Sequence, residues 1–237
     1  MGAELSPIDS PGPDPKIPEM QPNCNSIPTQ FLQLIDVDEC WIVVDKPSGL
    51  LSVPGRGEER QDCIARRVES IWPEARIVHR LDQATSGLMV LARGLDNQRC
   101  LSRSFELRQV SKGYVADILG HPSGDSGSVD LPLRCDWPNR PRQMVDPEHG
   151  RSALTHWKVL ERFSDRTRVA LTPVTGRSHQ LRVHMLSMGH PILGDELYMP
   201  PEQARGPETR LHLHATWLEL PHPGGGGPKR FDSAVPF

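Results

Sequence analysis

The chain has 237 residues, 24% of them charged, and a formal net charge of −3, so its length is sufficient for one or two domains with a substantial core. No apolar run approaches the roughly 20 residues of a membrane-spanning helix, and the start lacks the pattern of a signal peptide. Five widely spaced cysteines include no Cys-x-x-Cys pair, which argues against a disulfide framework or zinc ribbon and favours the reducing cytoplasm.

The first part of the chain is rich in proline. Residues 1–28 contain seven prolines and few large apolar side chains. Such a segment cannot bury enough surface to offset the entropy lost on ordering, so we expect a disordered tail. We expect one folded domain over residues 29–237.

Apolar periodicity predicts the ordered elements of the first half. Short apolar runs indicate strands, whereas apolar residues at a spacing of three and four indicate helices. The pattern predicts strands over 40–44, 77–78 and 88–92, a helix over 64–71 and a second helix around 101–105.

The second half is predicted to be mostly strand. Tyr114, Ala116 and Ile118 alternate along a strand over 113–119 and therefore share one face. The proline-rich run 130–143 is expected to be largely irregular. Further elements are strands over 154–163 and 168–174, a helix over 180–188 that ends at Gly189, an alternating half-buried strand over 211–217 and a hairpin tip at 224–227.

This irregular order of strands and helices predicts the fold class. Strand–helix units do not alternate along the chain, so a wholly parallel sheet is not expected. The order favours an α+β fold with a largely antiparallel sheet.

A polar cluster lies between two of the predicted strands. Residues 79–87 read HRLDQATSG and hold one carboxylate, Asp82, two positions after Arg80. Apolar residues flank the cluster on both sides, so rigid elements would hold a short polar loop. Loops held in this way often carry catalytic residues.

This cluster belongs to a longer family pattern. The string HRLDQATSGLMVLAR resembles the catalytic motif of the RluA-type pseudouridine synthases. Five further segments continue the resemblance, which covers about residues 30–237: Val44–Gly55, Lys112–Ala116, Gly176–His184, His190–Asp195 and Leu211–Ala215. The resemblance implies the pseudouridine synthase fold, a mixed central sheet flanked by helices and loops around one catalytic cleft. The run 130–143 is most similar to the RluA branch, which lacks an added N-terminal RNA-binding domain.

The implied reaction turns uridine into pseudouridine. It breaks the N1–C1′ bond, rotates the uracil and joins C5 to C1′, so it requires no redox cofactor and no metal. A carboxylate suits this chemistry because it can attack C1′ or remove a proton nearby. The resemblance implies that Asp82 is the catalytic carboxylate, and the sequence leaves open whether it attacks C1′ or deprotonates C2′.

Two further catalytic residues follow from the resemblance. Arg182 maps to the arginine that opposes protonation of the carboxyl group in a dry cleft; the alternative is a surface arginine paired along its helix. Tyr114 maps to the tyrosine motif and can stack on uracil; the alternative is a tyrosine that packs in the core.

Three residues are expected to bind RNA. Arg80 has the length and planar head to fill the gap that an extruded base leaves, with a structural salt bridge as the alternative. Arg177 and His179 are interpreted as phosphate-binding or loop-orienting groups. Many of the other cationic residues in the middle of the chain are also arginines, which bind phosphate in bidentate geometry.

The RluA branch implies two substrates: a uridine in a hairpin of 23S ribosomal RNA and one in the anticodon stem-loop of certain tRNAs. The first alternative is a synthase that acts on only one of these RNAs. The remote alternatives are an inactive RNA-binding module and a metal-dependent hydrolase built on His212, His214, His179 and His184. We expect a cytoplasmic monomer with no membrane partner, no small-molecule cofactor and no metal.

Overall fold

A computed structural model describes residues 32–200 and 210–237, so the tail predicted over residues 1–28 lies outside the described residues. The three helices of the described ranges are α1 (Ile64–Glu69), α2 (Gly94–Glu106) and α3 (Gln180–Ser187). Two 3-10 turns are η2 (Glu58–Arg60) and η3 (Trp137–Asn139). The strands are β1 (Gln33–Val37), β2 (Trp41–Lys46), β3 (Ala75–Ile77), β4 (Ser86–Arg93), β5 (Ser111–Leu119), β6 (Ser126–Asp130), β7 (Leu133–Cys135), β8 (Gln143–Val145), β9 (Leu154–Arg162), β10 (Arg166–Pro173), β11 (Leu213–Pro221) and β12 (Pro228–Asp232).

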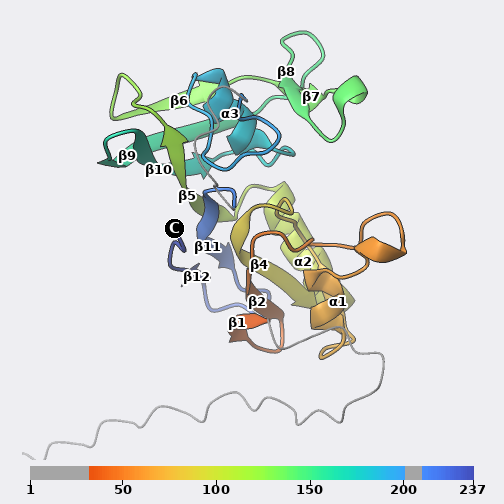
Figure 1. Cartoon of the computed structure of the whole chain (residues 1–237). Helices are drawn as coiled ribbons and strands as arrows, with labels where there is room; N and C mark the ends of the chain where they lie inside the picture. Colours follow the sequence, from red (N-terminus) through yellow and green to blue (C-terminus); the bar gives the residue numbers. More distant parts are fainter. Residues whose placement is uncertain (1–31, 201–209) are drawn as a thin grey trace, which may run out of the picture.

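One large mixed sheet organises the described chain. Its main order is β1-β2-β4-β11-β5-β10-β9-β6, with β3 beside β4 and β12 beside β11. Among the described pairs, β4 and β11 run parallel and the others are antiparallel. The α+β class with a largely antiparallel sheet is therefore confirmed. The parallel pair brings the start of β4 beside β11 in the middle of the sheet (Figure 1).

Strand β4 is buried on both faces. Leu88 and Val90 pack with Leu101 of α2, whereas Met89 and Leu91 pack with Ile64 of α1. This two-sided burial explains why its sequence is a continuous apolar run rather than an alternating one. The chain that enters β4 is therefore fixed to the centre of the fold.

Helix α3 packs on the other half of the sheet. Leu181 and Met185 belong to the same buried cluster as Ala116 of β5 and Leu171 of β10. The helix predicted over 180–188 is confirmed and ends before Gly189, whose φ of 80° suits glycine. The cluster fixes the first turn of α3 against the strands, close to the loop that precedes β4.

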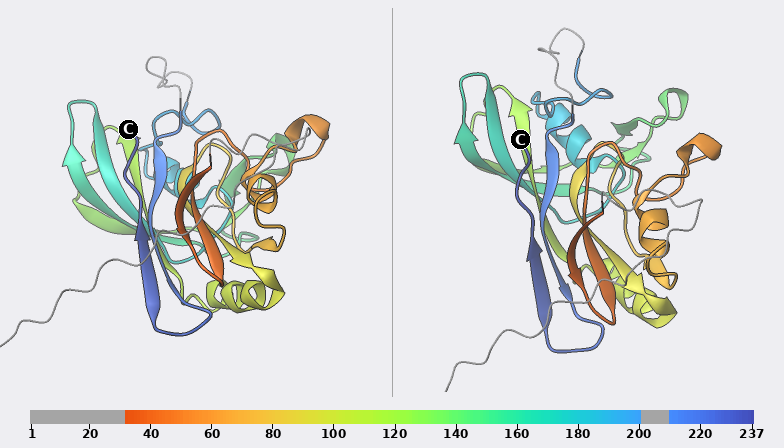
Figure 2. Two further views of the ribbon diagram at one scale, coloured as in Figure 1. Left: turned by 90° about the horizontal axis from the view of Figure 1, so that it is seen from below. Right: turned by 60° about the horizontal axis from the view of Figure 1, so that its bottom comes forward.

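Two sequence predictions need correction. Run 130–143 is more regular than expected, because β7 and β8 form a hairpin around η3 that projects on the same side as the η2 segment (Figure 2). Strand β11 is more buried than an alternating strand would be, with His214 only 1% exposed. A register shift between Ala215 and Trp217 also changes which side chains share a face.

Candidate active site

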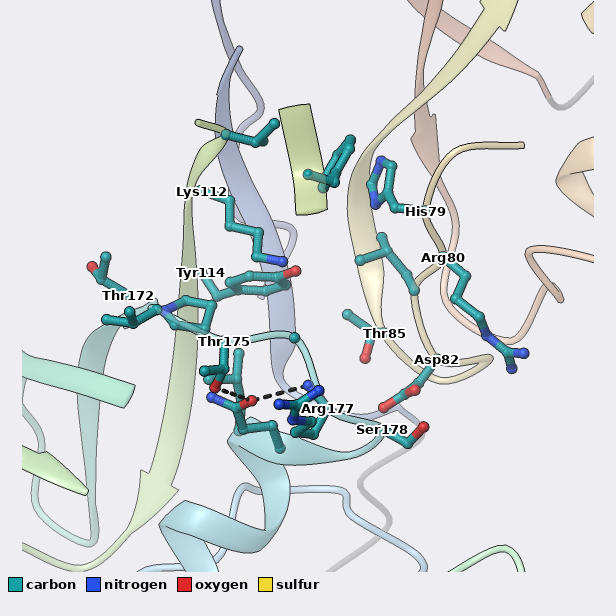
Figure 3. Close-up of a pocket in the computed structure, with 18 of the residues that line it drawn as sticks. His79, Arg80, Asp82, Thr85, Lys112, Tyr114, Thr172, Thr175, Arg177 and Ser178 are labelled. Atoms are coloured by element: carbon teal, nitrogen blue, oxygen red, sulfur yellow. Dashed lines mark hydrogen bonds between the residues drawn. The ribbon is translucent and has the colours of Figure 1, made fainter. Parts of the chain in front are cut away.

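A cavity of about 890 Å³ lies between the β4 half and the β10–α3 half of the sheet. All six residues that the sequence singled out line it: Asp82, Tyr114, Arg182, Arg80, Arg177 and His179. Figure 3 shows Lys112 and Tyr114 projecting from β5 on one side, with Asp82 and Arg80 on the other. Residues separated by as many as 102 positions thus meet at one site.

Asp82 lies on the loop between β3 and β4. Its carbonyl accepts the N–H of Thr85 at 3.1 Å, which closes a turn just before β4 begins. Gly87 then adopts a φ of 111°, and a Cβ there would lie 2.3 Å from the carbonyl oxygen of Ala215 on β11. Only glycine permits this close approach, so the Thr-Ser-Gly sequence allows the strand to start directly after the loop.

The segment after β2 braces the Asp82 loop. Lys46 is fully buried, and its ammonium donates to three carbonyls, including that of Gln83 at 3.0 Å. Ser52 Oγ donates to the carbonyl of Leu81 at 2.7 Å and accepts the N–H of Leu81 at 3.1 Å. The residues on both sides of Asp82 are therefore fixed by bonds from one neighbouring segment.

Lys46 is also a charge near the site. Burial lowers its pKa to about 7, and the negative charge of Asp82 opposes that shift. The three carbonyl oxygens occupy all three ammonium protons. Lys46 is thus part of the framework that holds the loop, and it does not line the cavity.

Arg182 is the third residue of α3, and its side chain is buried rather than exposed on the helix surface. Its side chain is 5% exposed, which excludes the alternative of a surface pair along the helix. Nε and Nη2 bind the two carboxylate oxygens of Asp195 at 2.8 and 2.6 Å, while Nη1 lies 3.8 Å from Oδ2 of Asp82. Burial alone would lower the pKa of Arg182, but the bonds to Asp195 and the charge of Asp82 raise it. A fixed positive charge therefore faces Asp82.

His179 lies on the other side of the Asp82 carboxylate. Its Nε2 is 4.0 Å from Oδ1 of Asp82, and its Nδ1 is 2.7 Å from the hydroxyl of Tyr198. That hydroxyl accepts the N–H of Gln143 at 2.7 Å, so its own proton is free to bind Nδ1. This arrangement favours the tautomer that carries its proton on Nε2, which faces Asp82. Burial lowers the pKa of His179 and keeps the ring neutral, against the pull of Asp82.

The local backbone at His179 is unusual. It has a φ of 52° at the start of α3, a conformation that few residues other than glycine adopt. Gln180 holds the preceding loop, because its Oε1 accepts the hydroxyl of Thr175 and the N–H of Arg177, as Figure 3 shows with dashed lines. Backbone strain held by surrounding bonds is characteristic of functional sites.

Tyr114 both packs against the core and lines the cavity, which were the two alternatives predicted for it. Its ring packs against the core cluster that contains Ala116 and Ile118, as the alternation along β5 predicted. The same ring lines the cavity. Burial, with a smaller effect from Asp82, raises the pKa of its hydroxyl well above the usual value, so the phenol stays protonated.

Arg80 and Arg177 occupy different positions around Asp82. Arg80 is exposed and forms no side-chain hydrogen bond or ion pair with any residue that the structure describes, so the alternative of a structural salt bridge is not supported. In Figure 3 it lies on the far side of Asp82 from Tyr114. Arg177 donates from Nε to the carbonyl of Ser152 at 3.0 Å, which leaves its terminal nitrogens available.

The histidines considered for a metal site do not gather at one point within the described ranges. Each has a hydrogen-bonding partner of its own: Tyr198 for His179, Thr155 for His184, Asp117 for His212 and Ser86 for His214. A different group, Asp38, Cys40 and His222, places ligand atoms within 4.8 Å of one another. None of those three lines the cavity.

Sequence reasoning missed Asp195 and Tyr198 as parts of the site. Both lie beyond α3, are less than 4% exposed, and contact Arg182 and His179 rather than the cavity itself. A signal was present, because Asp195 ends an apolar motif in which a buried carboxylate would require a cationic partner.

Comparisons with known proteins match most of the chain. The family model described as RNA pseudouridylate synthase matches residues 40–187. The Dual-specificity RNA pseudouridine synthase RluA of Escherichia coli (strain K12) is 50% identical over 216 residues, 91% of this chain and 98% of that protein. Its counterpart of the same name in Yersinia pestis is 52% identical over 201 residues, 84% of this chain and 97% of that protein.

Solved structures share the fold. Human RNA Pseudouridylate Synthase Domain Containing 1 superposes with a TM-score of 0.76 at 25% identity, covering 92% of this chain and 87% of that one. Human RNA Pseudouridylate Synthase Domain Containing 4 gives 0.70 at 27% identity, covering 86% and 88%.

Proposed function

Because this chain belongs to the RNA pseudouridylate synthase family and is an isomerase of RNA uridines, we propose that Asp82 is its catalytic carboxylate and that it has two RNA substrates. The observation that carries the proposal is the 3.8 Å approach of Arg182 to Asp82 inside the cavity that Tyr114 also lines. A carboxylate, a fixed cation and an aromatic surface are the groups that the reaction requires.

In the proposed mechanism, the target nucleoside leaves the RNA stack and enters the cavity. Asp82 attacks C1′ or removes the C2′ proton as the N1–C1′ bond breaks. The uracil rotates and C5 bonds to C1′, which displaces Asp82 from C1′ in the first route or is accompanied by return of the proton to C2′ in the second. The proton on C5 is then lost while N1 gains one. Deuterium at C2′ separates the two routes, because proton removal there predicts a primary isotope effect and attack at C1′ does not.

The neighbouring residues have distinct proposed roles. The Arg182 charge favours the ionised form of Asp82, and the fixed geometry avoids reorganisation during the reaction. Tyr114 offers its ring to the detached uracil while its hydroxyl stays protonated. His179 keeps its proposed role in orienting the loop or binding phosphate, and its Nε2, 4.0 Å from Oδ1 of Asp82, is near enough for the ring to pack beside the carboxylate without a hydrogen bond to it.

RNA contacts are proposed for Arg80 and Arg177. Arg80 has no partner among the described residues and stands next to the Asp82 loop, so it can fill the gap left by the extruded base. Arg177 can contact phosphate with its terminal nitrogens. Stem-loop substrates suit this mode because their loop bases are already partly unstacked.

The proposed substrates are 23S ribosomal RNA and the anticodon stem-loop of certain tRNAs, in line with the dual specificity named for the bacterial relatives. The second candidate is a synthase that acts on one of these RNAs alone. Mapping pseudouridine in total RNA from cells with and without the protein tests both. Sites that vanish in both RNA classes support dual specificity, loss in one class supports the second candidate, and no loss contradicts both.

We also propose a cytoplasmic monomer. Cys40, Cys63, Cys100 and Cys135 are free thiols, as suits a reducing compartment. No helix in the described ranges is both long and apolar enough to span a bilayer. Light scattering of the purified protein tests the monomer.

A further inference from the structure

The cavity is more positive than the protein around it. Its lining includes six cationic side chains but only two acidic ones, Asp82 and Glu106, although the whole chain carries a net charge of −3. Two of the cations already have roles near Asp82, since Arg182 binds Asp195 and Arg80 stands beside the loop. The remaining positive charge is therefore available to an anionic ligand.

Three arginines account for most of this excess. Arg108 follows α2, Arg151 precedes β9 and Arg177 precedes α3, so three separate segments bring them to one cavity. Within the described residues, neither Arg108 nor Arg151 has a side-chain hydrogen bond or ion pair. Arg177 uses only Nε, which donates to the carbonyl of Ser152.

The positive charges of Arg108 and Arg151 act on the guanidinium of Arg177. The pKa of Arg177 is lowered, first by burial and then by the positive charges of Arg151 and Arg108. Arg108 also has a φ of 58°, a left-handed conformation that costs energy for a residue other than glycine. Like charges held together in this way repel each other until an anion joins them.

We infer that Arg108, Arg151 and Arg177 form a binding site for a backbone phosphate of the substrate RNA, an inference that rests on the proposed function. Guanidinium groups match phosphate oxygens in bidentate geometry. The site shares the cavity with Asp82, so a phosphate held there would fix the strand that carries the extruded nucleoside.

The test compares charge-removing variants with a matched control. Arg108→Gln and Arg151→Gln, singly and together, remove positive charge while keeping polar, flexible side chains. Arg103→Gln is the control, because Arg103 is an exposed arginine of α2 that does not line the cavity. The melting temperatures should match that of the unmodified protein, since no side-chain bond is lost.

The measurement is affinity for an unmodified anticodon stem-loop transcript at several salt concentrations. Because the arginines share one phosphate, the double variant should lose about 0.7 from the slope of log affinity against log salt, and each single variant should lose part of that amount. In turnover assays KM should rise more than kcat falls. Slopes equal to that of the unmodified protein, or an equal change in Arg103→Gln, would overturn the inference.

The same experiment separates this inference from the proposed function. If the unmodified protein forms no pseudouridine in the transcript but the slopes change as expected, the phosphate site stands and the tRNA part of the proposed function fails. If pseudouridine forms and the slopes do not change, the proposed function stands and the phosphate site is rejected.

Discussion

Nη1 of Arg182 lies 3.8 Å from Oδ2 of Asp82, even though two other nitrogens of the same guanidinium bind Asp195 at 2.8 and 2.6 Å. Asp195 therefore holds the arginine in place, while the free Nη1 of the guanidinium faces Asp82. Asp195 is fully buried, so the anchor does not depend on solvent, and Tyr198 supports it with a ring 5.0 Å from the guanidinium carbon.

Replacement of Arg182 by Met tests the charge directed at Asp82. Methionine fills similar space but supplies no cation, so the isomerisation rate should fall by about 10²–10³, as for the loss of one preorganised electrostatic contact. Affinity for the stem-loop should change little, because the guanidinium is buried away from the exposed strand. Single-turnover rates and binding constants measured side by side distinguish this outcome from a pure affinity loss, which would indicate phosphate binding.

The pair of Arg182 and Asp195 makes a separate prediction about stability. Asp195→Asn leaves a buried cation without its carboxylate and should lower the free energy of unfolding by about 3–5 kcal/mol. The double variant with Arg182→Met should recover part of that loss, because no uncompensated charge remains, yet it should stay catalytically impaired. Denaturant unfolding of the four proteins measures the coupling; additive losses would show that the two residues act independently.

Tyr198 links the β7–β8 hairpin to His179. Tyr198→Phe keeps the ring but removes the hydroxyl that accepts the Gln143 N–H and binds Nδ1 of His179. We expect a stability loss of about 1–3 kcal/mol from the unpaired groups and a slower reaction. The rate loss should not add to that of His179→Gln, because both variants break one chain of bonds. Fully additive rate losses would contradict this link.

The resemblance and the residue pattern together predicted much of the fold and the site. Continuous apolar runs placed β2 and β4 correctly because burial on both faces leaves a local signal. Asp82, Tyr114 and Arg182 were predicted through the motifs that carry them. Their convergence could not follow from spacing alone, because it depends on the parallel pairing of β4 with β11, which joins residues 128 positions apart at Ser86 and His214.

The sequence did not predict the supporting bonds. Lys46 holds the carbonyl of Gln83 across 37 positions, and Ser52 holds Leu81 across 29. These contacts depend on where two loops meet, and loop paths have no periodicity from which they can be read. The burial of His214 was missed for a similar reason, since neighbouring strands rather than the alternation within β11 determine it.

The burial of His79 makes the stability of the protein depend on pH. Burial, with a smaller effect from Lys112, lowers its pKa from 6.5 to about 3, and its Nε2 accepts the N–H of Val90 at 3.0 Å. As pH falls through about 6.5, the imidazole of His79 therefore takes up a proton in the unfolded chain but stays neutral in the folded protein. The contribution of neutral His79 to the free energy of unfolding is fully present above pH 6.5. Below pH 6.5 it falls by about 1.4 kcal/mol for each pH unit.

His79→Phe should reduce the difference in unfolding free energy between pH 7.5 and pH 5.5 by about 1.4 kcal/mol. Phenylalanine keeps the stacking on Phe105, where the ring centroids are 4.7 Å apart. His149→Gln is the control, because that side chain is 68% exposed and stays in contact with water in the folded state. Equal pH dependence in His79→Phe and the unmodified protein would contradict the prediction.

The role of Asp82 is tested most sharply by counting pseudouridine after a single turnover with Asp82→Asn. Asparagine has nearly the same shape but can neither attack C1′ nor accept the C2′ proton as a carboxylate. The variant should bind the stem-loop with nearly unchanged affinity, melt within a few degrees of the unmodified protein and form no pseudouridine. Product formation at a rate near that of the unmodified protein would show that another group performs the chemistry.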